Sequence, residues 1–137
     1  AEEIIRFCVE KGVDPKQIVI GAAFYGRGWK GVPPEDNGLY QPNTGPISGG
    51  TSYSVLLTDF TEADGYEKHW DPVAKAPFLY NPTDSIFVTY DDTVSVKLKT
   101  QYAKENRLGG IMFWQLSSDS KDDASLLKAI YTEVAKK

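Results

Sequence analysis

The chain has 137 residues, of which 41% are hydrophobic and 25% charged, and its formal net charge is -4. This length fits one domain with a buried core, while the acidic balance and the lack of a basic tract argue against nucleic acid and membrane surfaces as partners. No apolar run is long enough to cross a membrane, and the single cysteine, Cys8, rules out a disulfide within the chain.

The chain opens with the pattern of a helix followed by a buried strand. Apolar residues recur on one helical face of residues 2–11, and Gly12 ends the pattern. Residues 17–24 (QIVIGAAF) then form a continuous apolar run without alternation, which is typical of a parallel strand covered on both faces.

The middle of the chain has the composition of a small α+β module. Residues 30–46 are rich in Pro, Gly, Asn and Asp, which indicates a loop. Residues 53–60 (YSVLLTDF) fit either a short helix or an irregular segment. Three segments then predict strands of an antiparallel sheet: residues 65–70 (GYEKHW), 76–80 (APFLY) and 85–90 (SIFVTY).

The last third returns to alternating helix and strand patterns. We predict a helix over residues 91–107, capped by Asp92 or Thr93, a strand over 111–116 (IMFWQL) and a helix over 122–137. The chain therefore contains two βα units, with the module inserted between the first strand and its helix. Such units occur in eight-stranded barrels and in open parallel sheets, and both possibilities remain at this point.

Both buried strands end in aromatic residues, where these folds place their ligands. Tyr25, Arg27 and Trp29 follow the first strand, and Trp114 lies at the matching place on the second. Because the carboxyl ends of parallel strands meet at one edge, we expect these side chains to gather there.

Three motifs resemble one known family in order and spacing. Residues 18–29 (IVIGAAFYGRGW), 87–92 (FVTYDD) and 108–119 (LGGIMFWQLSSD) are similar to the C-terminal part of family 18 glycoside hydrolases, the chitinases. The bacterial members with a chitinase insertion domain between barrel strand seven and its helix are the most similar group. The resemblance covers essentially the whole chain.

The resemblance implies an α/β fold that forms part of a TIM (β/α)8 barrel, from helix six to helix eight. Residues 1–30 and 92–137 would form the barrel units, and residues 31–91 an inserted α+β chitinase insertion domain. The longer protein would hydrolyse β-1,4-linked N-acetylglucosamine polymers by a retaining, substrate-assisted mechanism. Its partners would be chitin or N-acetylglucosamine oligosaccharides, and its location secreted or periplasmic.

The same resemblance assigns substrate contacts. Trp114 would form the floor beneath a sugar ring, and Arg27 and Tyr25 would lie in the cleft wall. Trp29 is a further candidate for a substrate contact.

The insertion offers additional candidates. The family brings a carboxylate from the early part of this module towards the sugars, and Asp59 and Glu62 are the nearby acidic residues. Trp70 and Asp71 match a recurrent pair of the module, whose expected role is to hold its small sheet together.

The family's catalytic motif, D-x-x-D-x-D-x-E, does not occur in this sequence. Its terminal Glu is the general acid, so we assign no catalytic residue and expect the chain alone to be inactive. Residues 89–92 (TYDD) resemble the family's Met-Tyr-Asp motif but belong to the end of the insertion. Two alternatives stay open: a non-catalytic, lectin-like chitin-binding relative, and another amino-sugar hydrolase such as one acting on peptidoglycan.

The remaining features point to neither a metal nor a cofactor. His69 is the only histidine and is expected on a solvated strand face. The chain begins without Met and already in helical rhythm, which suggests a piece of a longer protein. Its two buried strands would then have open edges, through which the isolated chain is expected to self-associate or lose stability.

Overall fold

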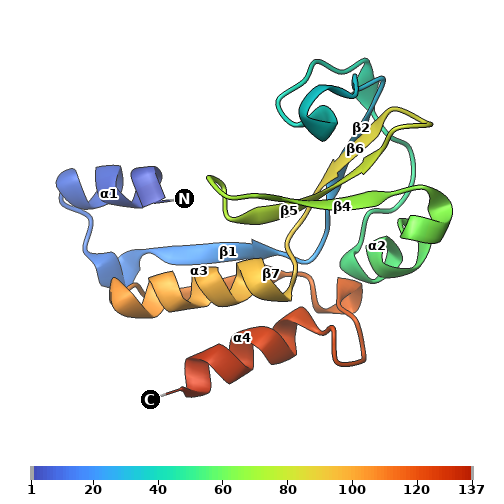
Figure 1. Ribbon diagram of the computed structural model, residues 1–137. Coiled ribbons are helices and arrows are strands. Elements are labelled where there is room, and N and C mark those ends of the chain that lie inside the picture. The colour runs from blue at the N-terminus through green and yellow to red at the C-terminus, as the bar shows by residue number, and fades with distance from the viewer. Residues whose placement is uncertain (1, 137) are drawn as a thin grey trace.

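The computed structural model describes residues 2–136 as an α/β fold with two separate sheets (Figure 1). Residues 1 and 137, the outer ends of the predicted barrel segments, lie outside the described residues. The elements in chain order are α1 (Glu2–Glu10), β1 (Val19–Ala23), β2 (Arg27–Lys30), β3 (Gly45–Pro46), α2 (Tyr53–Asp59), β4 (Glu67–Asp71), β5 (Ala76–Asn81), β6 (Ile86–Thr89), α3 (Thr93–Glu105), β7 (Gly110–Trp114) and α4 (Leu126–Ala135).

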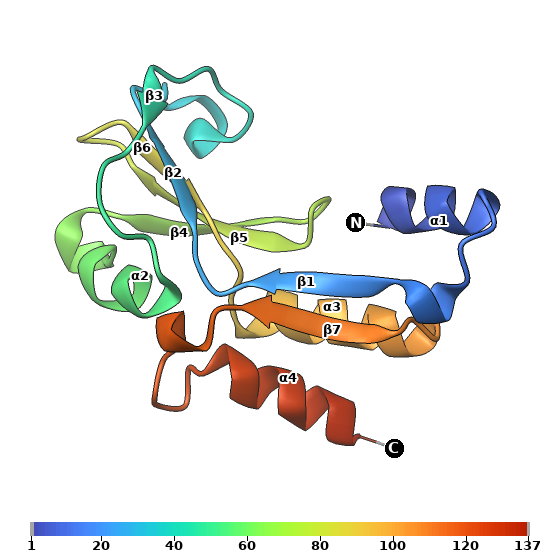
Figure 2. The ribbon, with the colours of Figure 1, turned by 180° about the vertical axis from the view of Figure 1, so that it is seen from behind.

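The two predicted buried strands pair in parallel, as expected. β1 and β7 form a two-stranded sheet in which Val19 pairs with Gly110 and Ala23 with Trp114. Figures 1 and 2 show α3 and α4 on one side of this sheet. The prediction that both faces are covered is wrong for residues 2–136: Val19 and Met112 are 51% and 52% exposed on the face away from the helices.

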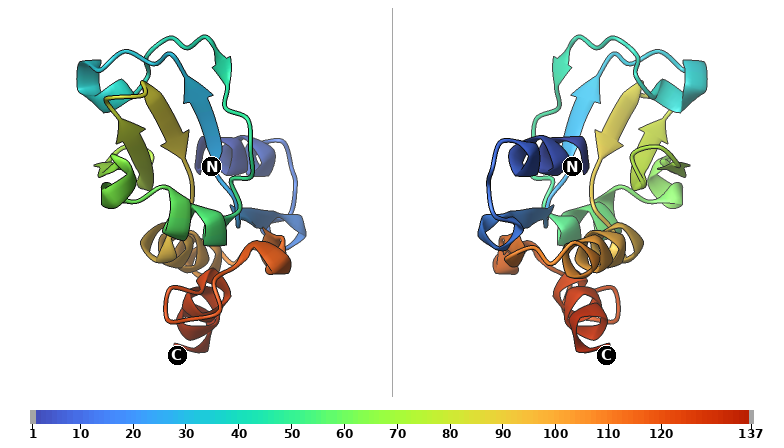
Figure 3. Two further views of the ribbon diagram at one scale, coloured as in Figure 1. Left: turned by 90° about the vertical axis from the view of Figure 1, so that its right-hand side faces the viewer. Right: turned by 90° about the vertical axis from the view of Figure 1, so that its left-hand side faces the viewer.

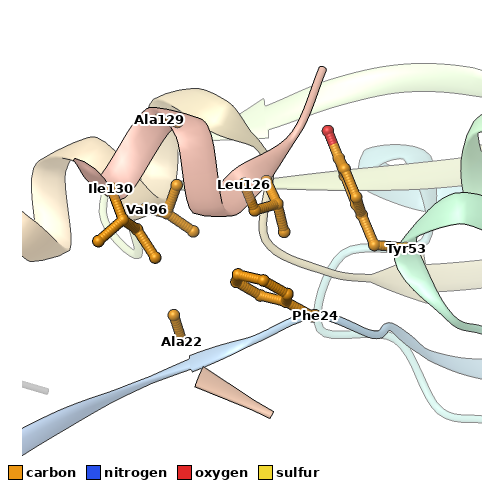
Figure 4. Packing of buried hydrophobic residues seen from close by; sticks show 7 residues of the cluster. All are labelled: Ala22, Phe24, Tyr53, Val96, Leu126, Ala129 and Ile130. Carbon is orange, nitrogen blue, oxygen red and sulfur yellow. The ribbon is translucent and has the colours of Figure 1, made fainter. Parts of the chain in front are cut away.

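The covered face holds the main core, which joins the sheet to three helices. Phe24 is fully buried and its ring stacks on Phe113 with the centroids 4.8 Å apart. Figure 4 shows the surrounding side chains, which come from β1, α2, α3 and α4. The buried members of this cluster are Ala22, Phe24, Tyr53, Val96, Leu126, Ala129 and Ile130.

The second sheet has five strands in the order β3-β2-β6-β5-β4, all antiparallel, which confirms the three strands predicted for the middle of the chain. The segment left open by the sequence is a helix, α2, and it packs against one face of this sheet through Leu56, Leu79 and Val88. In Figure 3 the strands rise away from β1, with α2 beside them.

The opposite face of the five-stranded sheet carries a row of rings across neighbouring strands. Trp29, Phe87, Phe78 and His69 follow one another with centroid distances of 6.2, 5.3 and 5.1 Å. The sequence context of His69 predicts a solvated face, and this prediction is wrong. Its ring stacks on Phe78, and its Nε2 lies 3.2 Å from a Glu67 carboxylate oxygen.

The chain passes between the two sheets at two tightly bonded places. β2 already pairs with β6, so the five-stranded sheet begins at Arg27, whereas the sequence-based division lies after residue 30. On the return, the Asp91 carboxylate accepts the Ala23 N–H at 3.1 Å. The next carboxylate, Asp92, caps α3 and accepts a hydrogen bond from Lys68 of β4 at 2.9 Å.

The last helix starts later than the sequence indicates. α4 begins at Leu126 rather than at residue 122. The Asp119 carboxylate accepts the N–H groups of Leu126 and Leu127 at 2.8 and 3.0 Å, and so satisfies donors of the first helical turn. The segment before the helix thus forms a loop held by Asp119, beside the end of β7.

Candidate functional site

The carboxyl ends of β1 and β7 lie at the same edge of the two-stranded sheet. Ala23 and Trp114 are paired in register, and the Phe24 N–H donates to the Trp114 carbonyl at 2.9 Å. Trp114 is 64% exposed because it lies on the uncovered face of the sheet. A large aromatic surface is therefore presented to solvent where α/β folds place their ligands.

The chain after β1 keeps an extended alternation that sorts its side chains onto two sides. Phe24, Gly26 and Gly28 are buried, whereas Tyr25 and Arg27 between them are not. Residues two apart in an extended chain point the same way, so Tyr25, Arg27 and Trp29 lie along one side. The aromatic and basic residues of this segment therefore share one side, and the glycines between them face the packed side.

The two glycines are required by space and not by a sharp turn. A Cβ added to Gly28 would lie 2.4 Å from the Ile47 Cδ1 atom, and one added to Gly26 would lie 2.9 Å from the Thr89 carbonyl oxygen. A Cβ at Gly26 would therefore press on the backbone of Thr89, whereas a Cβ at Gly28 would require the Ile47 side chain to move.

Tyr25 and Trp114 line one pocket of about 380 Å³ at this edge. Its other walls come from Thr51 and Ser52, which precede α2, and from the segment after β7. Tyr25 forms an isolated β-bridge with Ser52, and the Thr51 hydroxyl donates to the Gly26 carbonyl at 2.6 Å. The complete lining is Tyr25, Thr51, Ser52, Trp114, Gln115 and Ser118.

The loop that carries this wall is anchored to the segment before α4. Tyr53, the first residue of α2, is buried and donates its hydroxyl hydrogen to the Ala124 carbonyl at 3.1 Å. Burial raises the pKa of Tyr53 well above its usual range, with Asp92 adding to the effect, so the phenol stays neutral. Its role is structural.

The structure brings together some of the predicted site residues and not others. Arg27 is exposed and lies two residues beyond Tyr25 on the same side of the chain, outside the pocket lining. Asp59 ends α2 and Glu62 begins a short 3-10 helix over Glu62–Asp64; both are exposed and neither lines the pocket.

Four lining residues are absent from the sequence-based set: Thr51, Ser52, Gln115 and Ser118. Gln115 follows directly after Trp114, so its position beyond the strand end is a usable signal. Thr51 and Ser52 reach the site through a loop that returns to Gly26 from later in the chain. No local pattern marks such a contact.

The chemistry of the pocket suits a neutral polar ligand with an apolar face. The lining offers an indole, a phenol, three hydroxyls and one carboxamide, and it contains no carboxylate. Within residues 2–136, no three His, Cys, Asp or Glu side chains gather as metal ligands. No helix in the same residues is long and apolar enough to span a membrane.

Comparison with known protein families assigns the chain to one of them. Residues 1–119 match the family described as "Glycosyl hydrolases family 18". The chain belongs to glycosyl hydrolase family 18. It is 42% identical over 117 residues to Chitinase A1 of Niallia circulans, across 81% of this chain and 17% of that protein.

Solved structures of family 18 members agree. A family 18 N-acetylglucosaminidase from Paenibacillus barengoltzii has a TM-score of 0.87 and 37% identity, covering 96% of this chain and 38% of its own. A class V chitinase mutant from Cycas revoluta, in complex with (GlcNAc)3, has a TM-score of 0.80 and 29% identity, covering 96% and 37%. The chain therefore spans well under half the length of these family 18 relatives.

Proposed function

We propose that this chain is the part of a chitin-hydrolysing enzyme that forms one side of its sugar-binding cleft. In this proposal β1 and β7 are the seventh and eighth strands of a TIM barrel, and the five-stranded sheet with α2 is the chitinase insertion domain. The observation that carries the proposal is the exposed indole of Trp114 beside Tyr25, at the carboxyl ends of two parallel strands in a family 18 chain.

Each residue has a physical role in sugar binding. The exposed face of Trp114 can cover the apolar C–H face of a pyranose ring. Arg27 carries several fixed donors that suit sugar hydroxyls and an acetamido carbonyl, and the Tyr25 hydroxyl can donate or accept. Trp29 lies further along the same side but outside the lining of this pocket.

The chemical step requires groups from outside this chain. A retaining, substrate-assisted mechanism needs an acid that protonates the leaving oxygen while the substrate's N-acetyl oxygen attacks the anomeric carbon. The sequence lacks the motif that ends in this acid, and the pocket lining contains no carboxylate. We therefore expect the 137-residue chain to bind sugar without cleaving it.

A second candidate function fits the same pocket equally well, because the acid of the hydrolase would come from outside this chain. A lectin-like relative would keep Trp114 and Tyr25 while lacking the acid altogether. The segment of the longer protein at barrel strand four separates the two functions: a Glu at the end of the missing motif supports the hydrolase, and a Leu or Gln supports the lectin.

The isolated chain can be tested directly. Titration with N-acetylglucosamine oligomers, followed by tryptophan fluorescence, should show saturable binding in the wild-type chain and weaker binding in Trp114→Ala. A chain covering the complete family domain should hydrolyse chitin oligomers, and the 137-residue chain should not. Absence of saturable binding, or binding that Trp114→Ala leaves unchanged, would overturn the assignment of the cleft.

We further propose that the longer protein works in a secreted or periplasmic location, where it meets an insoluble polymer. Within residues 2–136, the two-stranded sheet of β1 and β7 has both edges unpaired and an apolar face that includes Val19 and Met112. The isolated chain should therefore self-associate. Size-exclusion chromatography at several concentrations tests this, and a strictly monomeric, highly stable chain would contradict it.

A further inference from the structure

A second pocket, of about 340 Å³, lies on the ring-bearing face of the five-stranded sheet. It shares no lining residue with the pocket around Trp114. The sheet contributes Trp29, Phe87 and Thr89, and the β4–β5 turn and the loop before β3 form the walls. The complete lining is Trp29, Val32, Gly38, Leu39, Tyr40, Gln41, Asn43, Asp71, Ala74, Phe87 and Thr89.

The floor of this pocket is aromatic and supported from below. Trp29 and Phe87 are paired across β2 and β6, and their ring centroids are 6.2 Å apart. Phe87 in turn contacts Phe78 of β5 at 5.3 Å. The half-buried indole of Trp29 is therefore held in place while part of it remains accessible. A fixed aromatic surface of this kind can contact the C–H face of a sugar without a further loss of side-chain freedom.

A buried carboxylate stands at the edge of this floor. One oxygen of Asp71 accepts the N–H groups of Val73 and Ala74 at 2.8 and 3.1 Å, and the other accepts the Tyr40 hydroxyl at 2.9 Å. A carboxylate has about four acceptor positions, so one remains for a ligand. The hydrogen bonds, led by that from Ala74, lower the pKa of Asp71, and the group stays charged at neutral pH.

Tyr40 is held at the pocket in an unusual conformation. Its side chain is 81% exposed, and its φ of +59° is rare for a bulky residue. The hydrogen bond to Asp71 fixes the phenol oxygen, so the ring is positioned even though little packs around it. Strained residues that persist in this way are concentrated at binding sites.

Further polar groups of the lining have unused hydrogen-bonding capacity. Three side-chain groups of the lining make no hydrogen bond within residues 2–136: the Thr89 hydroxyl, Oε1 of Gln41 and Nδ2 of Asn43. The pocket thus combines three aromatic rings, one carboxylate and three free polar groups. This is the mixture that recognises a ring with hydroxyls at its rim and an apolar face.

We propose that this pocket binds one pyranose unit of an amino-sugar oligomer, separately from the site at Trp114. The choice of an amino sugar rests on the proposed function. The volume is at the low end for small-molecule pockets, which favours a single ring over a chain. Trp29 and Tyr40 would contact the faces of the ring, and a sugar hydroxyl would donate to the free position on Asp71.

The three tryptophans report on three different surfaces, which allows a direct test. Trp29 lines the proposed pocket and Trp114 the site at the strand ends. Trp70 pairs with Pro77, next to the pairing of His69 with Phe78, and so lies on the opposite face of the same sheet. In ¹H–¹⁵N spectra of the chain, the three indole signals can be assigned from single Trp→Phe variants.

Titration with N-acetylglucosamine and its oligomers should shift the indole signal of Trp29 saturably and leave that of Trp70 unchanged. A shift of Trp114 alone would support the proposed function and overturn this second site. A shift of Trp29 alone would support the second site and contradict the proposed cleft. No shift of either signal up to the solubility limit of the sugar would overturn both.

Variants at Tyr40 separate a binding role from a structural one. Tyr40→Ala should weaken binding measured at Trp29 by about tenfold and leave binding at Trp114 unchanged. Tyr40→Phe keeps the ring and should bind more tightly than Tyr40→Ala, which checks that the ring itself makes the contact. Dispersed spectra of both variants establish folding. Equal affinity of the wild-type chain and Tyr40→Ala at Trp29 would overturn the role of the ring.

Discussion

The rings of Phe24 and Phe113 stack at 4.8 Å, and each residue immediately precedes a residue of the candidate site, Tyr25 or Trp114. Because successive side chains of an extended segment point to opposite sides, packing Phe24 and the partly buried Phe113 against the core directs Tyr25 and Trp114 outward. The core beneath the sheet therefore sets the direction of both site aromatics.

Replacing Phe24 by alanine should destabilise the chain severely. The side chain is fully buried and in contact with Phe113, so its loss leaves a cavity and removes the stacking. We expect a loss of about 3–5 kcal/mol in the free energy of unfolding, measured by urea denaturation. Phe24→Leu should cost clearly less. A loss below about 1 kcal/mol for Phe24→Ala would contradict the packing described above.

The close approach at Gly28 predicts a compensating pair. A Cβ at this position would meet the end of the Ile47 side chain, so Gly28→Ala should cost about 1–3 kcal/mol. Ile47→Ala removes the atoms in conflict, so the double variant should cost less than the sum of the two single variants. The double-mutant cycle is measured by urea denaturation. Additive losses would show that Ile47 is not the obstacle.

The contact between Lys68 and Asp92 predicts unequal effects for its two partners. Lys68 is more than half exposed, so Lys68→Met should change stability by less than about 1 kcal/mol. Asp92→Ala also removes the N-cap of α3 and should cost about 1–2 kcal/mol. Asp92→Ser retains a capping oxygen and should fall between the two by thermal or urea denaturation. Equal losses for the Ser and Ala variants would contradict a capping role.

Acidification should destabilise the chain through several carboxylates. The hydrogen bond from Lys136, followed by that from Gln101, lowers the pKa of Glu133, and bonds from Ser120 and Ala124 lower the pKa of Asp122. When the folded-state pKa is the lower one, the stabilisation is present above the ordinary values of 4.5 for Glu and 3.8 for Asp. It is lost as the pH falls through the folded-state values.

The thermal midpoint should therefore fall as the pH is lowered from about 5 to about 3. Glu133→Gln should have a lower midpoint at neutral pH and a smaller fall on acidification, because one of the responsible groups is gone. Glu105→Gln removes the same charge from an exposed residue of α3 that makes no side-chain hydrogen bond or ion pair within residues 2–136, and it serves as the control for net charge. A midpoint of Glu133→Gln that falls as steeply as that of the wild type would contradict the assignment.

Arg27 should matter for binding and little for stability. Its side chain is exposed and forms no ion pair within residues 2–136, so Arg27→Ala should change the free energy of unfolding by less than about 0.5 kcal/mol. Binding of N-acetylglucosamine oligomers, followed at the Trp114 indole, should weaken by about tenfold. Arg27→Lys should restore binding only in part, because an ammonium lacks the planar set of donors. A destabilised variant with unchanged affinity would assign Arg27 a structural role.

The sequence predicted five of the strands and the parallel pairing of β1 with β7, because continuous apolar runs and turn residues mark them locally. It left α2 open and did not indicate β2 and β3. It failed where burial depends on neighbours far along the chain. His69 alternates with polar residues, yet its ring packs on Phe78, a contact set by the register of β4 and β5. The apolar runs suggested two covered faces, but within residues 2–136 one face of β1 and β7 lacks a partner layer.

The candidate site was predictable in part for the same reason. Trp114 and Tyr25 directly follow or end recognisable strands, so the parallel topology placed them together. Thr51 and Ser52 depend on a loop that folds back onto Gly26, which no pattern in the sequence marks. Asp59 lies at the end of α2 and Glu62 in the 3-10 helix that follows, and both are outside the pocket lining, because position in the module alone does not predict where α2 ends.

Residues 24–26, which lead from β1 to β2, donate backbone hydrogen bonds to the carbonyls of Trp114 and Thr51. The segment that leads back from β6 to α3 is joined to the end of β1, because the Asp91 carboxylate accepts the Ala23 N–H. Both connecting segments are thus held by hydrogen bonds and are not free linkers. We therefore expect the five-stranded sheet to keep a fixed position over the ends of β1 and β7, and, in the proposed function, a bound polymer would meet a rigid wall there and not a hinged flap.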